Sequence, residues 1–310
     1  MKQLFLLLLA LGAPALALAQ DMRQDTYCNP LNIDYTYMIY NSDKDISYRS
    51  GADPAVVRFR GEYYMFVTRS NGYWHSKDLL DWDFIAPKDW YPQGSNAPAA
   101  HNYKDSVLYV TGDPSGSMSI LYSDNPKSGE WKATPAILHN LQDPDLFIDD
   151  DGKAYMFWGS SNVYPIRGME LDKNHRFLPK GEVKELFNLD MPRHGWERFG
   201  ENHSDTVLGG YIEGPWLTKH NGKYYMQYGA PGTEFNVYAD GVYVSRSSDG
   251  ALHLSEAQSR VIQTGGIYER SRTRQYGSGT RRRVLAFCFD GSFHQRQLGT
   301  PALHVSCRIR

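Results

Sequence analysis

The sequence has little cysteine, no long hydrophobic stretch beyond its first residues, and no excess of positive charge. Only three cysteines occur in 310 residues, and Cys28 is the only one before Cys288. An odd number leaves at least one cysteine unpaired, so we expect no structural disulfide and interpret Cys28 as a small buried apolar residue. No later segment approaches the roughly 20 apolar residues of a membrane helix, which predicts no membrane span.

The formal net charge is −2 at pH 7, and aromatic residues make up 14% of the chain. Nucleic-acid binding requires a basic face, so this balance excludes nucleic acid as the expected partner. Abundant aromatic rings favour a ligand with faces on which they can stack, and carbohydrate is such a ligand. The sequence does not indicate an oligomeric state.

The first twenty residues have the pattern of a secretory signal peptide. Lys2 supplies a positive start, Leu4 to Leu11 form an apolar run, and Ala17 to Ala19 provide a small-residue cleavage site. We therefore assign residues 1–19 to a signal peptide and expect a secreted or periplasmic protein.

Four stretches of the chain follow one pattern, in which a proline precedes an apolar strand, a turn and an aromatic-rich strand. These prolines are Pro54, Pro98, Pro144 and Pro215. The first two spacings, about 45 residues each, match a propeller blade of four short strands. The third spacing is longer and contains a loop insertion, roughly residues 179–210. The pattern predicts an all-β fold, a β-propeller with four recognisable blades in residues 20–250.

Acidic residues stand at three of the four inner-strand starts. They are Asp53, Asp143 and Glu213, whereas Ala97 takes the corresponding place in the second repeat. Because the first strand of every blade lines the central axis, these residues should converge on one site. Like charges raise each other's pKa, and glycosidic bond hydrolysis uses paired carboxylates in different protonation states. An Asp before Pro is also a common turn residue, but the three acids together favour a catalytic site.

Two other polar clusters suggest metal sites but lack the required ligand spacing. The run from Asp149 to Gly152 has no distal glutamate of a calcium hand, so we interpret it as a hairpin turn. The cluster of His194, Glu197 and Glu201 with His203 lacks the HExxH spacing and is interpreted as a solvated loop rim that contacts substrate. We expect no metal site and no required cofactor, and a structural calcium ion would have no evident ligand set.

Three motifs in order, ADPAVV, DPDLFIDDDGKAYMFWG and EGPWLTKHNGKYYMQY, resemble glycoside hydrolase family 43. The resemblance runs from about Tyr27 to Gly250. It implies a five-bladed β-propeller that acts on arabinose-, xylose- or galactose-containing polysaccharides with inversion of configuration. It also implies that Asp53 is the general base, that Glu213 is the general acid, and that Asp143 orients the acid. Inversion requires about 6.5–9.5 Å between the carboxyl groups of base and acid, which leaves room for water.

Four further residues are expected to contact the sugar. Tyr73 and Trp74 follow the second strand and should reach the rim of the pocket, and we add Asn96 and His203. The resulting hypothesis is an exo-acting α-L-arabinofuranosidase or β-xylosidase.

Alternatives from other classes stay open. A non-catalytic carbohydrate-binding propeller would need the pocket but no acid. A retaining fructan hydrolase would carry Asn-Asp-Pro-Asn in the first blade, where this chain has Ala52 before Asp53 and Ala55 after Pro54. An inactive, truncated hydrolase is the third alternative.

The repeat pattern stops after Gly250. Residues 251–310 are rich in arginine, do not repeat the blade pattern, and contain Cys288 and Cys307. With permitted synonymous codons, residues 251–277 read one base later can spell PFTYQKHNPVSYKPGGFMNGAGHGST, which supplies the Gly-His-Gly turn that the family resemblance implies for a fifth blade. The stretch from Ser278 can likewise spell VQEHGGVFWHFASMALSINVNWERRL. We interpret residues 251–310 as an atypical tail, an out-of-frame and disrupted fifth blade, and predict poor packing and weak or no activity.

Overall fold

The structure, a computed structural model, describes residues 53–246 except 69, 71, 89–95, 114–116, 136–137, 206, 208 and 236, and also residues 251–252. Beyond this range it describes five strands: β1 (Met38–Asn41), β2 (Ile46–Tyr48), β21 (Ser271–Ser278), β22 (Val284–Asp290) and β23 (Val305–Ser306). The predicted signal peptide and Cys28 lie outside the described residues. Among the described residues, no helix has the length and apolar character to cross a membrane.

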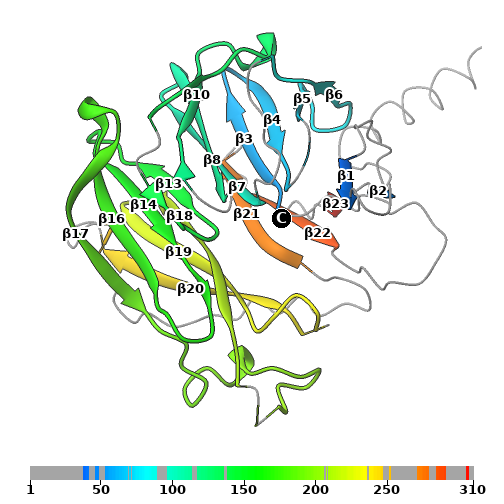
Figure 1. Cartoon of the computed structure of the whole chain (residues 1–310), viewed down its shortest axis with the longest axis vertical. Coiled ribbons are helices and arrows are strands. Elements are labelled where there is room, and N and C mark those ends of the chain that lie inside the picture. Colours follow the sequence, from blue (N-terminus) through cyan, green and yellow to red (C-terminus); the bar gives the residue numbers. More distant parts are fainter. Residues whose placement is uncertain are drawn as a thin grey trace, which may run out of the picture.

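Four four-stranded antiparallel sheets form the blades of a β-propeller (Figure 1). Blade one contains β3 (Ala55–Phe59), β4 (Glu62–Phe66), β5 (Tyr73–Ser76) and β6 (Asp83–Ile85). Blade two contains β7 (Asn96–Tyr103), β8 (Val107–Asp113), β10 (Leu121–Ser123) and β11 (Lys132–Ala133). Blade three contains β13 (Asp145–Ile148), β14 (Ala154–Trp158), β16 (Ile166–Asp172) and β17 (Leu178–Phe187).

Blade four is built differently, because a short strand that follows blade three joins its inner edge. The order is β15 (Ser160–Ser161), β18 (Ile212–His220), β19 (Lys223–Ala230) and β20 (Ala239–Arg246). The remaining described elements are a two-stranded sheet and three single-turn 3-10 helices. They are β9 (Ser117–Met118), β12 (Leu138–His139), η1 (Pro126–Ser128), η2 (Lys173–His175) and η3 (Gly195–Glu197). The predicted all-β propeller fold is confirmed.

Tight turns join the first two strands of the blades where the sequence predicts them. In blade one Phe59 pairs with Glu62 across Arg60 and Gly61, which have φ values of 50° and 84°. Two successive residues at positive φ are typical of the tight hairpin turn whose twist matches that of the strands. In blade three the Asp149 amide donates to the Lys153 carbonyl across the acidic run. That run is therefore a hairpin turn, as expected.

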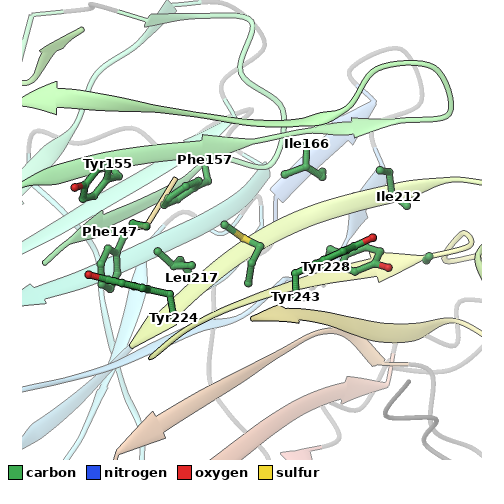
Figure 2. Packing of buried hydrophobic residues seen from close by; sticks show 12 residues of the cluster. Phe147, Tyr155, Phe157, Ile166, Ile212, Leu217, Tyr224, Tyr228 and Tyr243 are labelled. Atoms are coloured by element: carbon green, nitrogen blue, oxygen red, sulfur yellow. The ribbon is translucent and has the colours of Figure 1, made fainter. Parts of the chain in front are cut away.

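Apolar side chains fill the space between neighbouring blades in three clusters, one for each adjacent pair among the four blades. Figure 2 shows the cluster between blades three and four, whose members include Phe157, Ile212 and Tyr228. All three of these side chains are fully buried. Because a blade packs against a neighbour on each face, its strands can be apolar on both sides.

A buried polar contact also joins blades three and four. The Asp149 carboxylate, at the end of β13, accepts hydrogen bonds from the Lys219 ammonium and the Tyr224 hydroxyl. Burial of Asp149 opposes its ionisation, but these hydrogen bonds outweigh burial and lower its pKa. The acidic turn thus holds two blades together.

A three-stranded sheet of β21, β22 and β23 accompanies the four blades. Strand β21 contacts β3 of blade one and also β18, β19 and β20 of blade four. The described sheets include no fifth four-stranded blade. Most of residues 251–310 lies outside the described residues, so the interpretation of the tail as an out-of-frame blade stays a prediction.

Candidate active site

Four equivalent positions surround the propeller axis. Asp53, Ala97, Asp143 and Gly214 each precede a proline, and their φ values are 50°, 43°, 49° and 63°. Among residues with a side chain, aspartate and asparagine tolerate this left-handed region best. The four residues and their prolines line a narrow cavity of about 30 Å³. Asp53 and Asp143 thus occupy equivalent positions at one site.

Glu213 is not equivalent to Asp53 and Asp143, which corrects the expected register. The residue before the proline in blade four is Gly214, and Glu213 lies one position earlier. In the strand pairing Glu213 lies opposite Gly229, as Asn96 lies opposite Asp113 in blade two, and an irregularity follows each pair. A shift of one residue in a strand turns a side chain to the other face. The predicted acid therefore differs from the two aspartates in orientation.

A hydrogen-bonded chain fixes the Asp53 carboxylate between blades one and two. The Thr68 hydroxyl donates to Asp53 Oδ2 over 2.6 Å, and the Ala97 amide donates to Thr68 Oγ1 over 2.8 Å. Only 9% of Thr68 is exposed. The carboxylate is thus held in one orientation, as a general base must be.

Glu213 has different partners for its two carboxylate oxygens. The Tyr238 hydroxyl donates to Oε1 over 2.8 Å, and the Ser160 hydroxyl donates to Oε2 over 3.4 Å. Ser160 also lies 3.1 Å, Oγ to hydroxyl oxygen, from Tyr211. Strand β15 places Ser160 here, because Ser160 pairs directly with Glu213 in the sheet.

The electrostatics of two tyrosines show that the three carboxylates share one neighbourhood. Burial raises the pKa of Tyr238 well above its ordinary value, and the charges of Glu213 and Asp53 add to the effect. Burial also raises the pKa of Tyr211, where Glu213 and Asp143 contribute. Both hydroxyls therefore stay protonated at neutral pH and can donate hydrogen bonds.

Tyr73 and Trp74 do not reach the pocket rim as expected. Both lie in β5, the third strand from the axis, with 0% and 3% of their surface exposed. The Trp131 indole N–H donates to the Tyr73 hydroxyl over 3.1 Å, and the Trp74 ring meets the Phe84 ring at 5.2 Å between centroids. Neither ring has a face left for a sugar, because the packing of the blade covers both.

Asn96 begins β7, at the position in blade two that corresponds to Glu213 in blade four. His203 lies in the insertion before β18, and its Nδ1 is 3.3 Å from the Arg198 carbonyl oxygen. Asn96 therefore stands at the axis, whereas His203 belongs to a loop.

The insertion is anchored by a buried carboxylate rather than forming a solvated rim throughout. Glu197 is fully buried, and it accepts hydrogen bonds from the Tyr228 hydroxyl at 2.7 Å and the Asp190 amide at 2.7 Å. Its Oε1 also lies 3.1 Å from His194 Nδ1. Within the described ranges no three His, Cys, Asp or Glu side chains gather as metal ligands would.

Several residues near Glu213 were missed from the sequence. Tyr211 could have been found, because strand alternation places it on the same side as Glu213. Its ring stacks on Phe199 at 6.4 Å, and Phe199 meets Phe235 at 5.6 Å between centroids. Tyr238 lies 25 residues from Glu213, so no local pattern reveals that contact.

An open pocket of about 570 Å³ is lined mainly by blade three and by β15. Ser160 lines this pocket and contacts Glu213, and Gln142, another lining residue, directly precedes Asp143. Its other walls include Trp158, Tyr164 and Arg167.

Comparison with known proteins identifies the family. The sequence profile of Glycosyl hydrolases family 43 matches residues 43–284. The chain belongs to this family. Proteins of family 43 hydrolyse glycosidic bonds, and the resemblance expected from the three motifs is confirmed.

Curated family 43 relatives differ in substrate. The chain is 26% identical to a xylan 1,3-beta-xylosidase of Vibrio sp over 219 residues, covering 59% of this chain and 37% of that protein. It is 24% identical to an extracellular exo-alpha-(1->5)-L-arabinofuranosidase of Streptomyces avermitilis, covering 88% of this chain and 56% of that protein. The chain thus spans less than two thirds of the length of either relative.

The crystal structure of a thermostable family-43 glycoside hydrolase has a similar fold. It superposes with a TM-score of 0.63 at 19% identity, covering 92% of each chain.

Proposed function

We propose that this family 43 chain is an inverting, exo-acting glycosidase that releases arabinose or xylose units from plant polysaccharides or oligosaccharides. The observation that carries the proposal is that two carboxylates near the propeller axis, Asp53 and Glu213, have different hydrogen-bond partners. Asp53 is held by Thr68 at the axial cavity, whereas Glu213 lies between Tyr238 and Ser160. Opposed roles as base and acid require such a difference in environment.

In the proposed reaction, Asp53 accepts a proton from water as that water attacks the anomeric carbon. Glu213 donates its proton to the glycosidic oxygen as the bond to the leaving group breaks. Asp143 orients the acid. In addition to burial, its charge and that of Glu213 both raise the pKa of Tyr211, so the two carboxylates lie near the same hydroxyl. The protonated Tyr238 hydroxyl supports the Glu213 carboxylate that forms. No cofactor is required for this chemistry.

The relatives support the class of substrate, since their names include a xylosidase and an arabinofuranosidase. One of them is named extracellular, which supports a secreted or periplasmic location together with the signal pattern of residues 1–19. Asn96, at the axis, is the remaining sugar-contact candidate among those expected from the inner strands.

The test separates an enzyme from a binding propeller. Glu213→Gln should lower kcat on arabino- or xylo-oligosaccharides about 100- to 10,000-fold, because general acid catalysis contributes that much, and should leave oligosaccharide binding measurable by calorimetry. Glu182→Gln, on the exposed strand β17, serves as the matched control and should keep full activity. A lectin would show no turnover in the parent chain and no change in the variant.

Proton NMR of the first-formed sugar tests the stereochemistry. Inversion is expected, and a product that retains the anomeric configuration would favour the fructan-hydrolase type of mechanism.

A further inference from the structure

The pocket lined mainly by blade three and β15 lies on the acid side of the site. Its lining residues come from blade two, blade three and the strand β15, and none comes from blade one, which carries Asp53. Ser160 joins the pocket to Glu213, because it contacts Oε2 while Tyr238 contacts Oε1. The side of Glu213 that carries Oε2 therefore faces Ser160, a residue that lines this pocket. In an inverting glycosidase the proton of the general acid goes to the leaving group.

The pocket is large enough for more than a bare leaving oxygen. Its volume of about 570 Å³ falls within the roughly 300–1,000 Å³ of sites for small organic ligands. Polar groups around it include Asn140, Gln142 and Ser161. One acidic side chain, Asp113, and one basic side chain, Arg167, are among its lining residues. This balanced, hydrogen-bonding lining suits a neutral sugar chain.

Tyr164 stands at the edge of this pocket in a fixed, exposed position. The Ser161 hydroxyl accepts hydrogen bonds from the amides of Val163 and Tyr164, both over 2.9 Å, which holds the turn. The Arg167 guanidinium lies 5.5 Å from the centre of the Tyr164 ring. Yet 63% of Tyr164 remains exposed, an uncommon exposure for a large aromatic residue beside a pocket. Such a ring is a platform on which a sugar can stack.

We infer that this pocket is a leaving-group subsite for a neutral oligosaccharide, with Tyr164 as its stacking platform. The inference rests on the proposed function and extends it, because it places the leaving part of the sugar chain in this pocket and names Tyr164 as the residue on which a sugar stacks. The enzyme then removes a terminal pentose while blade three holds the rest of the chain.

The test compares substrates that share a terminal sugar but differ in leaving group. For each protein, kcat/KM is measured on arabinotriose and xylotriose and on the matching 4-nitrophenyl glycosides, and the ratio of trisaccharide to aryl glycoside is formed. Tyr164→Ala should lower this ratio about ten-fold, because a stacked sugar is lost while the aryl leaving group depends less on the platform. Tyr164→Phe keeps the ring and should hold the ratio within about two-fold.

Val163→Ala is the matched control, since Val163 is 72% exposed on the same turn and is not among the pocket-lining residues. Its ratio should equal that of the parent. An unchanged ratio in Tyr164→Ala overturns the subsite. Equal losses on both substrate types overturn it as well.

Failure of the proposed function gives a different result. If neither the parent chain nor the chain with the alternative reading of residues 251–310 hydrolyses either substrate type, the glycosidase proposal fails, and calorimetry with the trisaccharides then tests the pocket alone. A Kd raised about ten-fold by Tyr164→Ala supports the platform. Absence of binding to the parent chain, or an unchanged Kd in the variant, overturns it.

Discussion

The Tyr238 hydroxyl is one of two hydroxyl groups that donate a hydrogen bond to the Glu213 carboxylate. It is 3% exposed, donates to Glu213 Oε1, and stays protonated because burial raises its pKa well above the ordinary value. A hydrogen bond donated to a carboxylate stabilises the ionised form. If Glu213 is the general acid, as proposed, the same bond limits the pH range over which it keeps its proton.

Tyr238→Phe should move the alkaline limb of the kcat/KM profile to higher pH. Without the donated bond the acid keeps its proton to a higher pH, and a bond to a charged group of about 1.5–3 kcal/mol corresponds to roughly one to two pH units. The profile is measured from pH 4 to 9 on an oligosaccharide. Tyr225→Phe, on the same sheet but outside the site, should leave the limb in place, and an equal displacement in that control would remove the role given to Tyr238.

Asp145 is a buried carboxyl that no catalytic step uses. It is 3% exposed, and its Oδ2 accepts the Leu217 amide over 2.8 Å, which links blade three to blade four. Burial raises the pKa of Asp145 to about 7, and the single backbone bond opposes this only in part. Because the folded pKa lies above the unfolded value, the contribution of Asp145 to folding stability is fully present below about pH 4. It is lost as the pH rises toward 7 and beyond.

Asp145→Asn should remove this pH dependence while keeping an acceptor for the Leu217 amide. Relative to the parent, the free energy of unfolding of the variant should increase by about 2–4 kcal/mol between pH 4 and pH 8, because the pKa of Asp145 is raised by roughly three units. Urea unfolding at several pH values measures the gain. Asp81→Asn, an exposed control, should follow the parent curve. If the parent and Asp145→Asn curves run parallel, Asp145 is not the titrating group.

At the scale of elements, the short strand β15 positions the acid. Gly159 leaves blade three at φ 151°, its amide donates to the Gln142 carbonyl over 2.9 Å, and its carbonyl accepts the Gly214 amide over 3.1 Å. Ser160 then pairs with Glu213. Only glycine adopts such a φ readily, and a Cβ at this position would lie 2.7 Å from Ile166 Cδ1. Gly159 thus allows the chain to pass from one blade to the next beside the site.

Gly159→Ala should displace Ser160 from Glu213. We expect kcat/KM to fall about 10- to 100-fold, since misplacements on the order of 1 Å cost that much, and stability to fall by about 1–3 kcal/mol. Kinetics and thermal unfolding are measured together. Gly181→Ala is the control, because it has φ 85° with no atoms within 4 Å of an added Cβ. It should lose some stability and no activity; comparable activity losses in both variants would contradict the role of β15.

The blades and the two aspartates were predictable because each repeat begins with a proline that follows a turn residue. The rest depended on contacts that no local pattern contains. Glu213 was placed in the wrong register because it lies two residues before Pro215, whereas Asp53 and Asp143 lie directly before their prolines. The four residues of β5 are all buried, so Tyr73 and Trp74 serve packing, although their position after the second strand suggested the rim of the pocket.

At the scale of the whole molecule, the face of blade four turned away from blade three contains a buried amide side chain without hydrogen-bond partners among the described residues. In the sheet Trp216, Gln227 and Val242 lie opposite one another on one face, while Leu217, Met226 and Tyr243 face the core with blade three. Gln227 is 2% exposed, yet neither of its side-chain polar atoms has a hydrogen-bond partner in the part of the chain that the structure describes. A buried unsatisfied polar group costs about 1–3 kcal/mol. A complete neighbouring blade would supply partners and close the ring.

Replacing residues 251–310 with the alternative reading should therefore raise both stability and activity. A full blade covers the outer face of blade four and the facing side of blade one, and it removes sheet edges that favour aggregation. We expect Tm to rise by roughly 5 °C or more and kcat on pentose oligosaccharides to rise about ten-fold or more, because the axial site becomes enclosed. Scanning calorimetry and product assays compare the two chains, with a scrambled tail of the same composition as control.

DNA sequencing across codons 240–310 shows which reading the gene encodes. If the exchanged chain is no more stable than the present one, the present tail already closes the propeller and residues 251–310 are its own form of a fifth blade.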